Sequence, residues 1–161
     1  MSDSHDHLEN IRKAVKVFLE RRIEVLLHAG DFCSPFVFRE LEPLKGRISA
    51  MYGVFGNNDG DRVLLVEKSA GLCTLRDAVS KLEIGGRRIV IMHYPDVAEN
   101  LYNSGDFDLV IFGHTHQLVE KRNERATLIN PGTVAGYLAD RATVAIYESE
   151  TGSHEIVTLA S

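Results

Sequence analysis

The chain contains 161 residues, of which 44% are hydrophobic and 25% are charged. Domains usually contain about 100–200 residues, so the length predicts a single domain over residues 1–161. The composition excludes an intrinsically disordered chain, because it supplies enough apolar side chains for a core. The 23 acidic residues outnumber the 18 Lys and Arg residues, and the net charge of −5 argues against broad binding to nucleic acids.

The sequence has no apolar run near the roughly 18 residues that a membrane span requires. Its first residues also lack the basic and apolar regions of a signal peptide, so we expect a cytoplasmic protein with no membrane partner. The two cysteines, Cys33 and Cys73, lie far apart and form no CxxC motif. This spacing favours reduced thiols, which is consistent with the expected location.

The first half of the chain is typical of alternating helices and strands. Apolar residues recur at steps of three and four from residue 8 to residue 22, which is the period of an amphipathic helix. Ser34 is placed to cap a second helix, and glycines follow two short apolar segments that are typical of strands. The elements predicted after the first helix are a strand at 23–27, a helix at 35–44, a strand at 48–55 and a helix at 61–68.

The second half is typical of antiparallel β-structure. Gly85 and Gly86 separate the apolar segments 81–84 and 87–92, and this pair favours a two-residue hairpin turn because both positions need positive φ. After the hairpin we predict a helix at 96–102 and strands at 109–112, 118–121, 127–129, 143–147 and 155–159. The two halves together predict an α/β fold with mixed sheets.

Candidate metal ligands follow the predicted strands, and the carboxyl ends of strands are where α/β sheets bind ligands. Alternate residues of an extended segment point the same way, so Asp3 can share a site with His5, and His114 can share one with His116. The whole set is Asp3, His5, Asp31, Asn57, His93, His114 and His116. Seven ligands are too many for one tetrahedral ion, but they suit two ions if one carboxylate bridges them.

The order of these motifs, D-x-H, G-D, G-N, H and G-H-x-H, resembles that of the calcineurin-like metallophosphoesterases. The short chain, the G-N-N-D loop at 56–59 and the N-P-G-T segment at 130–133 are similar to the small bacterial and archaeal phosphodiesterase branch. That branch also includes the retromer subunit of the same fold. The resemblance spans nearly the whole chain and implies a sandwich of two mixed β-sheets flanked by helices.

The resemblance also implies how the ligands divide between two ions. The first ion would be held by Asp3, His5 and His116, the second by Asn57, His93 and His114, and Asp31 would lie between them. The implied function is a dinuclear metal-dependent phosphodiesterase, in which a hydroxide that bridges the ions attacks a small or nucleotide-like phosphodiester. The residues that we expect to be catalytic are Asp31, Asn57, His93 and His114.

The metal and the partners follow from the same resemblance. Oxygen and nitrogen ligands without a thiolate suit Mn²⁺, which we expect, and also Zn²⁺, Fe²⁺ or Ni²⁺. A small phosphodiester is the expected partner, and a homo-oligomer remains open. The alternative function is a non-catalytic protein-binding scaffold of the same fold. Because every ligand position is filled, the enzyme is the favoured interpretation.

Three further polar residues are expected close to the substrate, namely Asn58, Asp59 and His7. Many phosphomonoesterase relatives have a His where this chain has Asn58, and that His assists the leaving group. Asn cannot donate a proton as an imidazolium does, which favours diesters with acidic leaving groups. Asp59 has the alternative role of fixing its loop, and His7 that of capping the first helix.

His28 and the 130–132 segment can each be interpreted as structural or as functional. His28, three residues before Asp31, is predicted to pack beside the end of its strand rather than to bind a metal. The Asn130-Pro131-Gly132 segment either lines the site or is a simple turn.

The start of the chain departs from the family pattern. Relatives place a hydrophobic strand before D-x-H, whereas only Met1 and Ser2 precede Asp3 here. The usual first strand is therefore expected to be missing, unless native residues precede Met1. Without that strand we expect Asp3 and His5 to lie on a frayed terminus and the first metal site to be the weaker one.

Overall fold

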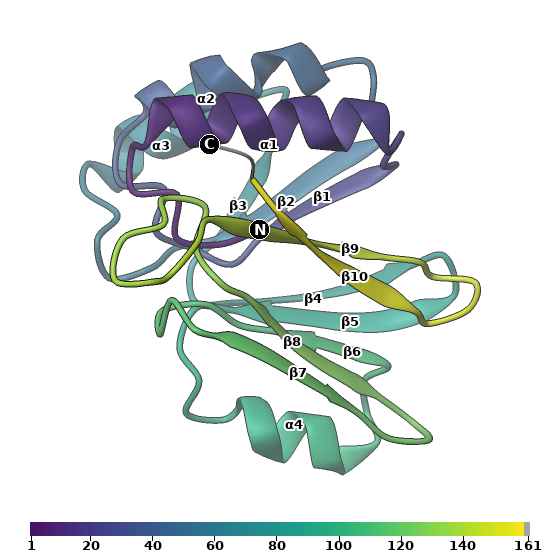
Figure 1. The fold of residues 1–161 in the computed structure, drawn as a ribbon. Coiled ribbons are helices and arrows are strands. Elements are labelled where there is room, and N and C mark those ends of the chain that lie inside the picture. The colour runs from purple at the N-terminus through teal and green to yellow at the C-terminus, as the bar shows by residue number, and fades with distance from the viewer. Residues whose placement is uncertain (160–161) are drawn as a thin grey trace.

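Two layers of β-sheet form the centre of the molecule, and helices cover both outer faces (Figure 1). The structure is a computed structural model that describes residues 1–159. The helices of the first half of the chain lie over one sheet layer, and the helix of the second half lies under the other (Figure 1). None of the helices within residues 1–159 combines the length and the hydropathy needed to cross a bilayer.

The first half contains the alternating elements that the sequence predicts. They are α1 (Leu8–Glu20), β1 (Val25–His28), α2 (Phe36–Leu41), a 3₁₀ turn η1 (Glu42–Leu44), β2 (Ala50–Val54), α3 (Arg62–Ser69) and β3 (Thr74–Arg76). The helix predicted at 35–44 is divided into α2 and η1, because Pro43 lacks the amide that a continuous α-helix would use. The short strand β3 was not predicted.

The expected cap of α2 is wrong. Pro35 is the N-cap residue and makes no side-chain hydrogen bond. The hydroxyl of Ser34 instead donates to Asp6 Oδ1 at 2.7 Å, and the Ser34 amide donates to the same atom at 3.1 Å. Ser34 therefore ties the loop after β1 to the segment before α1.

The second half supplies most of the β-structure. Its elements are β4 (Val79–Ile84), β5 (Arg87–Met92), α4 (Ala98–Ser104), β6 (Leu109–Ile111), β7 (Leu118–Arg122), β8 (Thr127–Pro131), β9 (Thr143–Tyr147) and β10 (His154–Thr158). The predicted hairpin is confirmed, with φ of 56° at Gly85 and 72° at Gly86.

The strands pair into one mixed sheet, one parallel sheet and one antiparallel pair. The largest sheet has the order β4-β5-β6-β8-β7, with β5, β6 and β8 parallel and with antiparallel partners at both edges. The second sheet is parallel, with the order β1-β2-β3, and β9 pairs with β10. Apolar side chains of both layers, among them Val54, Ile91 and Ile129, fill the space between them.

Separate apolar clusters attach the helices to the outer faces. Buried residues of α1 and α2, such as Phe18 and Leu41, pack with Leu26 of β1. Tyr102 of α4 packs with Val110 of β6 and with further residues of the larger sheet. Apolar packing thus holds the helices against the outer faces of the two sheet layers.

Residues 1–3 take the place of the missing strand. The Met1 amino group donates to the Leu27 carbonyl at 2.8 Å, and the Ala29 amide donates to the Met1 carbonyl at 3.0 Å. On the other side, the Val134 amide donates to the Ser2 carbonyl at 3.0 Å. No regular strand precedes α1 within residues 1–7, as expected, but the short segment still joins β1 to residues 133–135.

The expectation of a frayed terminus is wrong. Asp3 is fully buried, its amide donates to the Gly30 carbonyl at 3.0 Å, and its carbonyl accepts from the Ala135 amide at 3.1 Å. A segment hydrogen-bonded on both sides is as fixed as a strand within a sheet. The physical reason for expecting a weaker first metal site is therefore removed.

Candidate metal centre

The predicted ligands come together at the carboxyl edge of the strands. Asp31 follows β1, Asn57 follows β2, His93 follows β5, and the 113–116 loop follows β6. Asp3 and His5 reach the same edge from the segment beside β1. Parallel strands end at one edge, so side chains from distant parts of the sequence converge there.

Two motif glycines allow this close approach. A Cβ atom added to Gly56 would lie 2.1 Å from Asp31 Oδ1, and one added to Gly113 would lie 2.0 Å from Ser2 Oγ. Both distances are far below van der Waals contact, so only glycine fits beside these atoms. The glycine before Asn57 and the one before His114 are thus required by packing of the site itself.

Replacing Gly56 with Ala is expected to lower the free energy of unfolding by at least about 2 kcal/mol and to impair metal binding, because Asp31 must move. Gly60→Ala in the same loop is the matched control, since its Cβ would lie 3.6 Å from the Cys33 carbonyl oxygen, an ordinary contact. Urea unfolding and metal titration of both variants measure the difference. Equal behaviour of the two variants would show that Gly56 is not needed to accommodate Asp31.

The first group of donors is Asp3, His5 and His116. The Nε2 atoms of His5 and His116 face each other at 3.0 Å, and Asp3 Oδ1 lies 3.3 Å from His116 Nε2 and 3.8 Å from His5 Nε2. Asp3 Oδ2 accepts from the His114 amide at 3.1 Å. Within the described residues, Asp3 Oδ1 is the buried side-chain oxygen that lacks a hydrogen-bond partner.

The second group is centred on Asn57. Its Oδ1 lies 2.9 Å from His93 Nε2 and 2.9 Å from His114 Nδ1. Asp31 stands between the two groups, because its Oδ2 is 3.5 Å from His5 Nε2 and 3.5 Å from His93 Nε2. The structure thus brings all the predicted ligands together, with Asp31 between the two groups of donors.

Hydrogen bonds at the far side of two rings determine which nitrogen faces the centre. The Nδ1 atom of His93 donates to the Ala29 carbonyl at 2.8 Å, and that of His116 donates to the Tyr137 carbonyl at 2.8 Å. A carbonyl oxygen can only accept, so these Nδ1 atoms carry the proton and each neutral ring turns a lone pair inward. Such contacts orient histidines that bind metals.

His5 is held in a similar way by Cys33, whose Sγ is 3.3 Å from His5 Nδ1. The carboxylate of Asp3, followed by the Cys33 thiol, raises the pKa of His5 to about 10 in the metal-free protein. A metal ion that binds His5 Nε2 must therefore displace a proton. The sequence interpretation assigned Cys33 no role, although its position two residues after Asp31 places it in the same loop.

The donor set fits cations. The lone pair of His93 Nε2 faces Asn57 Oδ1, and Asp3 Oδ1 is buried without a partner. Acceptors that converge without donors are stabilised by a positive ion. Two sets of acidic and imidazole groups are close enough to hold a metal, namely Asp3, His5 and His116, and Asp3, Asp31 and His93.

Strained backbone is concentrated at the same residues. Left-handed φ angles cost free energy for residues with a Cβ atom and persist where the surroundings impose them, often at functional sites. The φ angles lie between 41° and 68° at Asp3, His5, Asp31, His114 and His116.

The side chain of Asp59 fixes the loops of the site through hydrogen bonds to their backbone amides. Its Oδ2 accepts from the Gly56 amide at 2.6 Å and from the Asp31 amide at 3.2 Å, and its Oδ1 accepts from the Cys33 amide at 2.8 Å. Asp59 is 8% exposed. This geometry favours the loop-fixing role over contact with a substrate.

Asn58 and His7 are also engaged by the protein. The Asn58 amide donates to Asp31 Oδ1 at 2.8 Å, and its side-chain Nδ2 donates to Asp31 Oδ2 at 2.8 Å. His7 is the N-cap of α1, and its Nδ1 accepts from the Asn10 amide at 3.2 Å. Asn58 thus orients the central carboxylate, and His7 has the capping role that the sequence left open.

His28 and Asn130 support the site without joining it. His28 is fully buried, stacks on Phe32 with ring centroids 3.8 Å apart and contacts Ser4 Oγ at 3.1 Å, which confirms the predicted packing. Asn130 Nδ2 donates to the Gly113 carbonyl at 2.9 Å and to Thr115 Oγ1 at 3.0 Å. The 130–132 segment therefore fixes the G-H-x-H loop.

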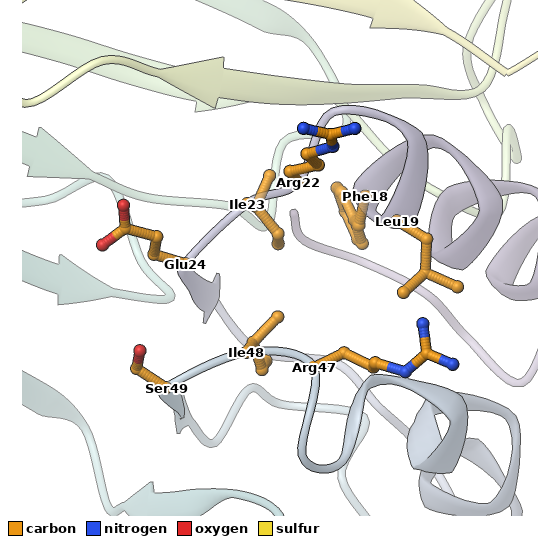
Figure 2. A pocket seen from close by; sticks show the side chains of 8 residues that line it. All are labelled: Phe18, Leu19, Arg22, Ile23, Glu24, Arg47, Ile48 and Ser49. Carbon is orange, nitrogen blue, oxygen red and sulfur yellow. The ribbon is translucent and has the colours of Figure 1, made fainter.

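A cavity lies where the chain enters β1 and β2 (Figure 2), at the opposite ends of these strands from the candidate ligands. It has a volume of about 390 Å³ and opens between the end of α1 and the residues that precede β1 and β2. Phe18, Ile23 and Ile48 line it, and Arg22 and Arg47 stand beside it. None of the candidate metal ligands borders this cavity.

Comparison with known sequences places these observations in a family. A model described as a calcineurin-like phosphoesterase superfamily domain matches residues 1–152. A phosphodiesterase of Methanocaldococcus jannaschii is 39% identical over 163 residues, which cover 99% of this chain and 96% of the relative. A probable metallophosphoesterase of Methanothermobacter thermautotrophicus is 33% identical over 142 residues, which cover 83% of this chain and 74% of the relative.

Solved structures confirm the predicted sandwich. An archaeal phosphodiesterase superposes with a TM-score of 0.88 at 36% identity, over 99% of this chain and 97% of the other. The phosphoesterase YfcE of E. coli has a TM-score of 0.64 at 17% identity, over 99% and 97% of the two chains. Zinc-bound Vps29 of Entamoeba histolytica has a TM-score of 0.60 at 22% identity, over 90% and 89%. The last two likenesses show the fold alone.

Proposed function

The chain belongs to the calcineurin-like phosphoesterase superfamily, and we propose that it hydrolyses a small phosphodiester at a centre that holds two divalent metal ions. Membership makes it a metal-dependent phosphoesterase. The observation that carries the dinuclear proposal is the position of Asp31 Oδ2, 3.5 Å from an imidazole nitrogen of each donor group.

The residues divide between the two proposed ions as follows. Asp3, His5 and His116 would hold the first, Asn57, His93 and His114 the second, and Asp31 both. When bound, such ions supply a water of lowered pKa as nucleophile and positive charge for the phosphoryl and leaving oxygens.

Charge explains how an acidic protein could bind a phosphate. Asp3 and Asp31 bring about −2 to the centre, whereas two divalent ions bring about +4, so a net positive charge remains. Asn57 and the histidines add no negative charge. The centre is thus a local exception to the net charge of −5 of the whole chain.

The proposal of a diester rests on Asn58 and on the named relatives. The side chain at this position donates to Asp31 and cannot supply a proton to a leaving oxygen. His7 is occupied as a helix cap. Diesters whose leaving groups depart without protonation therefore suit the centre best, and a relative of 39% identity is named a phosphodiesterase.

We infer Mn²⁺ as the metal, since the donors are oxygen and nitrogen and no thiolate faces the centre. Zn²⁺, Fe²⁺ and Ni²⁺ fit the same donors. A cytoplasmic location is supported by the free thiols of Cys33 and Cys73. The non-catalytic scaffold is the less favoured alternative, because all the ligand positions are filled and the terminus that carries Asp3 is firmly held.

The test is metal analysis combined with a pair of substrates. Protein stripped with a chelator and reloaded with Mn²⁺ is expected to bind two ions and to hydrolyse bis(4-nitrophenyl) phosphate faster than 4-nitrophenyl phosphate. Removal of the metal should abolish both reactions. If folded, metal-loaded protein hydrolyses no diester, the scaffold function should replace the enzyme.

A further inference from the structure

Two exposed tyrosines stand at the two ends of the candidate metal centre, and the proposed chemistry uses neither. Tyr94 is 44% exposed and Tyr137 is 52% exposed. Tyr94 and Tyr137 lie in loops that carry or support the donors. No sequence motif indicated either residue.

Tyr94 stands beside the donors of the second group. It directly follows His93, and its ring centroid lies 5.1 Å from that of His93 and 5.0 Å from that of His114. The two imidazoles contact part of the ring and hold it at the edge of the centre. The large exposed fraction leaves the remainder of the ring free to contact a ligand.

Tyr137 stands beside the donors of the first group. Its carbonyl accepts from His116 Nδ1 at 2.8 Å, so its backbone is tied to a candidate ligand. Its ring centroid lies 5.6 Å from that of His7 and 6.5 Å from that of His5. The next residue, Leu138, is 93% exposed and has a left-handed φ of 58°, so the loop presents apolar surface at this end.

The arrangement matches the shape of a diester. A phosphodiester carries two organic groups, each attached to the phosphorus through an oxygen. If the phosphate bound at the centre, these two groups would point outward. Ligand sites commonly combine a few polar groups with aromatic walls. Exposed rings fixed on either side of a charged centre therefore favour ligands with flat, aromatic groups, which stack on tyrosine more strongly than alkyl groups do.

We propose that Tyr94 and Tyr137 are specificity-determining residues whose rings stack against aromatic groups esterified to the phosphate. The substrate class is then aryl or nucleoside phosphodiesters rather than dialkyl ones. This inference rests on the proposed phosphodiesterase function, because it assumes that the phosphate binds at the metal centre.

Binding of two unreactive diesters tests the proposal without reference to turnover. Calorimetric titration of the Mn²⁺-loaded full chain with diphenyl phosphate and with dimethyl phosphate should show a preference of about 100-fold for the diphenyl compound. Tyr94→Leu and Tyr137→Leu should each lower the affinity for diphenyl phosphate about tenfold and leave that for dimethyl phosphate unchanged. Tyr94→Phe and Tyr137→Phe keep the ring and should bind within about twofold of the original chain.

Controls separate this inference from the proposed function. Val66→Ala, on the exposed side of α3, removes exposed apolar surface without touching the centre and should alter neither affinity. With bis(4-nitrophenyl) phosphate, the Leu variants should raise KM more than they lower kcat. If the original chain hydrolyses this diester but the Leu variants weaken both ligands equally, the rings only support the histidines and the inference is wrong. If the original chain hydrolyses no diester, the proposed function itself fails.

Discussion

Asp31→Asn is expected to lower phosphodiesterase activity by more than about 100-fold and to reduce the number of ions bound per chain. Residues that merely orient a metal ligand typically contribute 10–100-fold, so a carboxylate shared by both ions should contribute more. Its Oδ2 lies 3.5 Å from His5 Nε2 and 3.5 Å from His93 Nε2, one from each donor group. Asn at this position removes the negative charge between two dications.

The experiment compares metal content and diester turnover in this variant and in Asp61→Asn. Asp61 is a matched control, because it lies in the segment next to the Asn57 loop and its Oδ1 accepts from the Leu64 amide at 3.1 Å as the cap of α3. Asn caps helices as well as Asp does, so the control should retain both ions and full activity. Two ions and an undiminished rate in Asp31→Asn would show that Asp31 is not the shared ligand.

The convergence of the ligands could be predicted because it depends on strand order and on short motifs. Asp31, Asn57 and His93 each follow an apolar segment, and the carboxyl ends of such strands meet at one edge. The glycines before Asp31, Asn57 and His114 mark positions where the backbone passes close to another side chain. The motifs and the apolar segments are local features, so they can be recognised from the sequence alone.

The state of the N-terminal segment could not be predicted, because it depends on partners far along the chain. Met1 and Ser2 look too few to form a strand, and only the structure shows that Leu27, Ala29 and Val134 bond to them. The same reason applies to Ser34, whose partner is Asp6 rather than the start of α2. Hydrogen bonds between distant segments override local signals of this kind.

The aromatic and sulfur contacts of the centre were missed for a related reason. Tyr94 and Cys33 carry no motif, and their contacts with His114 and His5 come only from the path of the loops. Adjacency to a predicted ligand is the one signal that was present, since Tyr94 follows His93 and Cys33 lies two residues after Asp31.

The second large effect is expected for substitution of Asp59. Its two candidate roles, fixing the loops and acting on the substrate, predict different results. As a loop-fixing residue, it stabilises the metal-free fold through three backbone amides, those of Asp31, Cys33 and Gly56. As a residue that acts on the substrate, it would affect turnover and leave folding unchanged. A stability measurement on metal-free protein separates these roles, since neither metal nor substrate contributes to it.

Asp59→Asn is expected to lower the free energy of unfolding by about 2–4 kcal/mol, because an amide group can accept at only one of the two carboxylate positions and leaves buried N–H groups unpaired. Metal affinity and diester turnover should fall as well, since the amides of Asp31 and Gly56 position the shared carboxylate and the Asn57 loop. Urea unfolding of the metal-free protein, followed by Mn²⁺ titration, measures both effects against Asp61→Asn, which should change stability by less than about 0.5 kcal/mol. A variant that loses turnover while its unfolding matches that of the control would instead assign Asp59 to the substrate, because a carboxylate that holds three amides cannot be removed without a cost in stability.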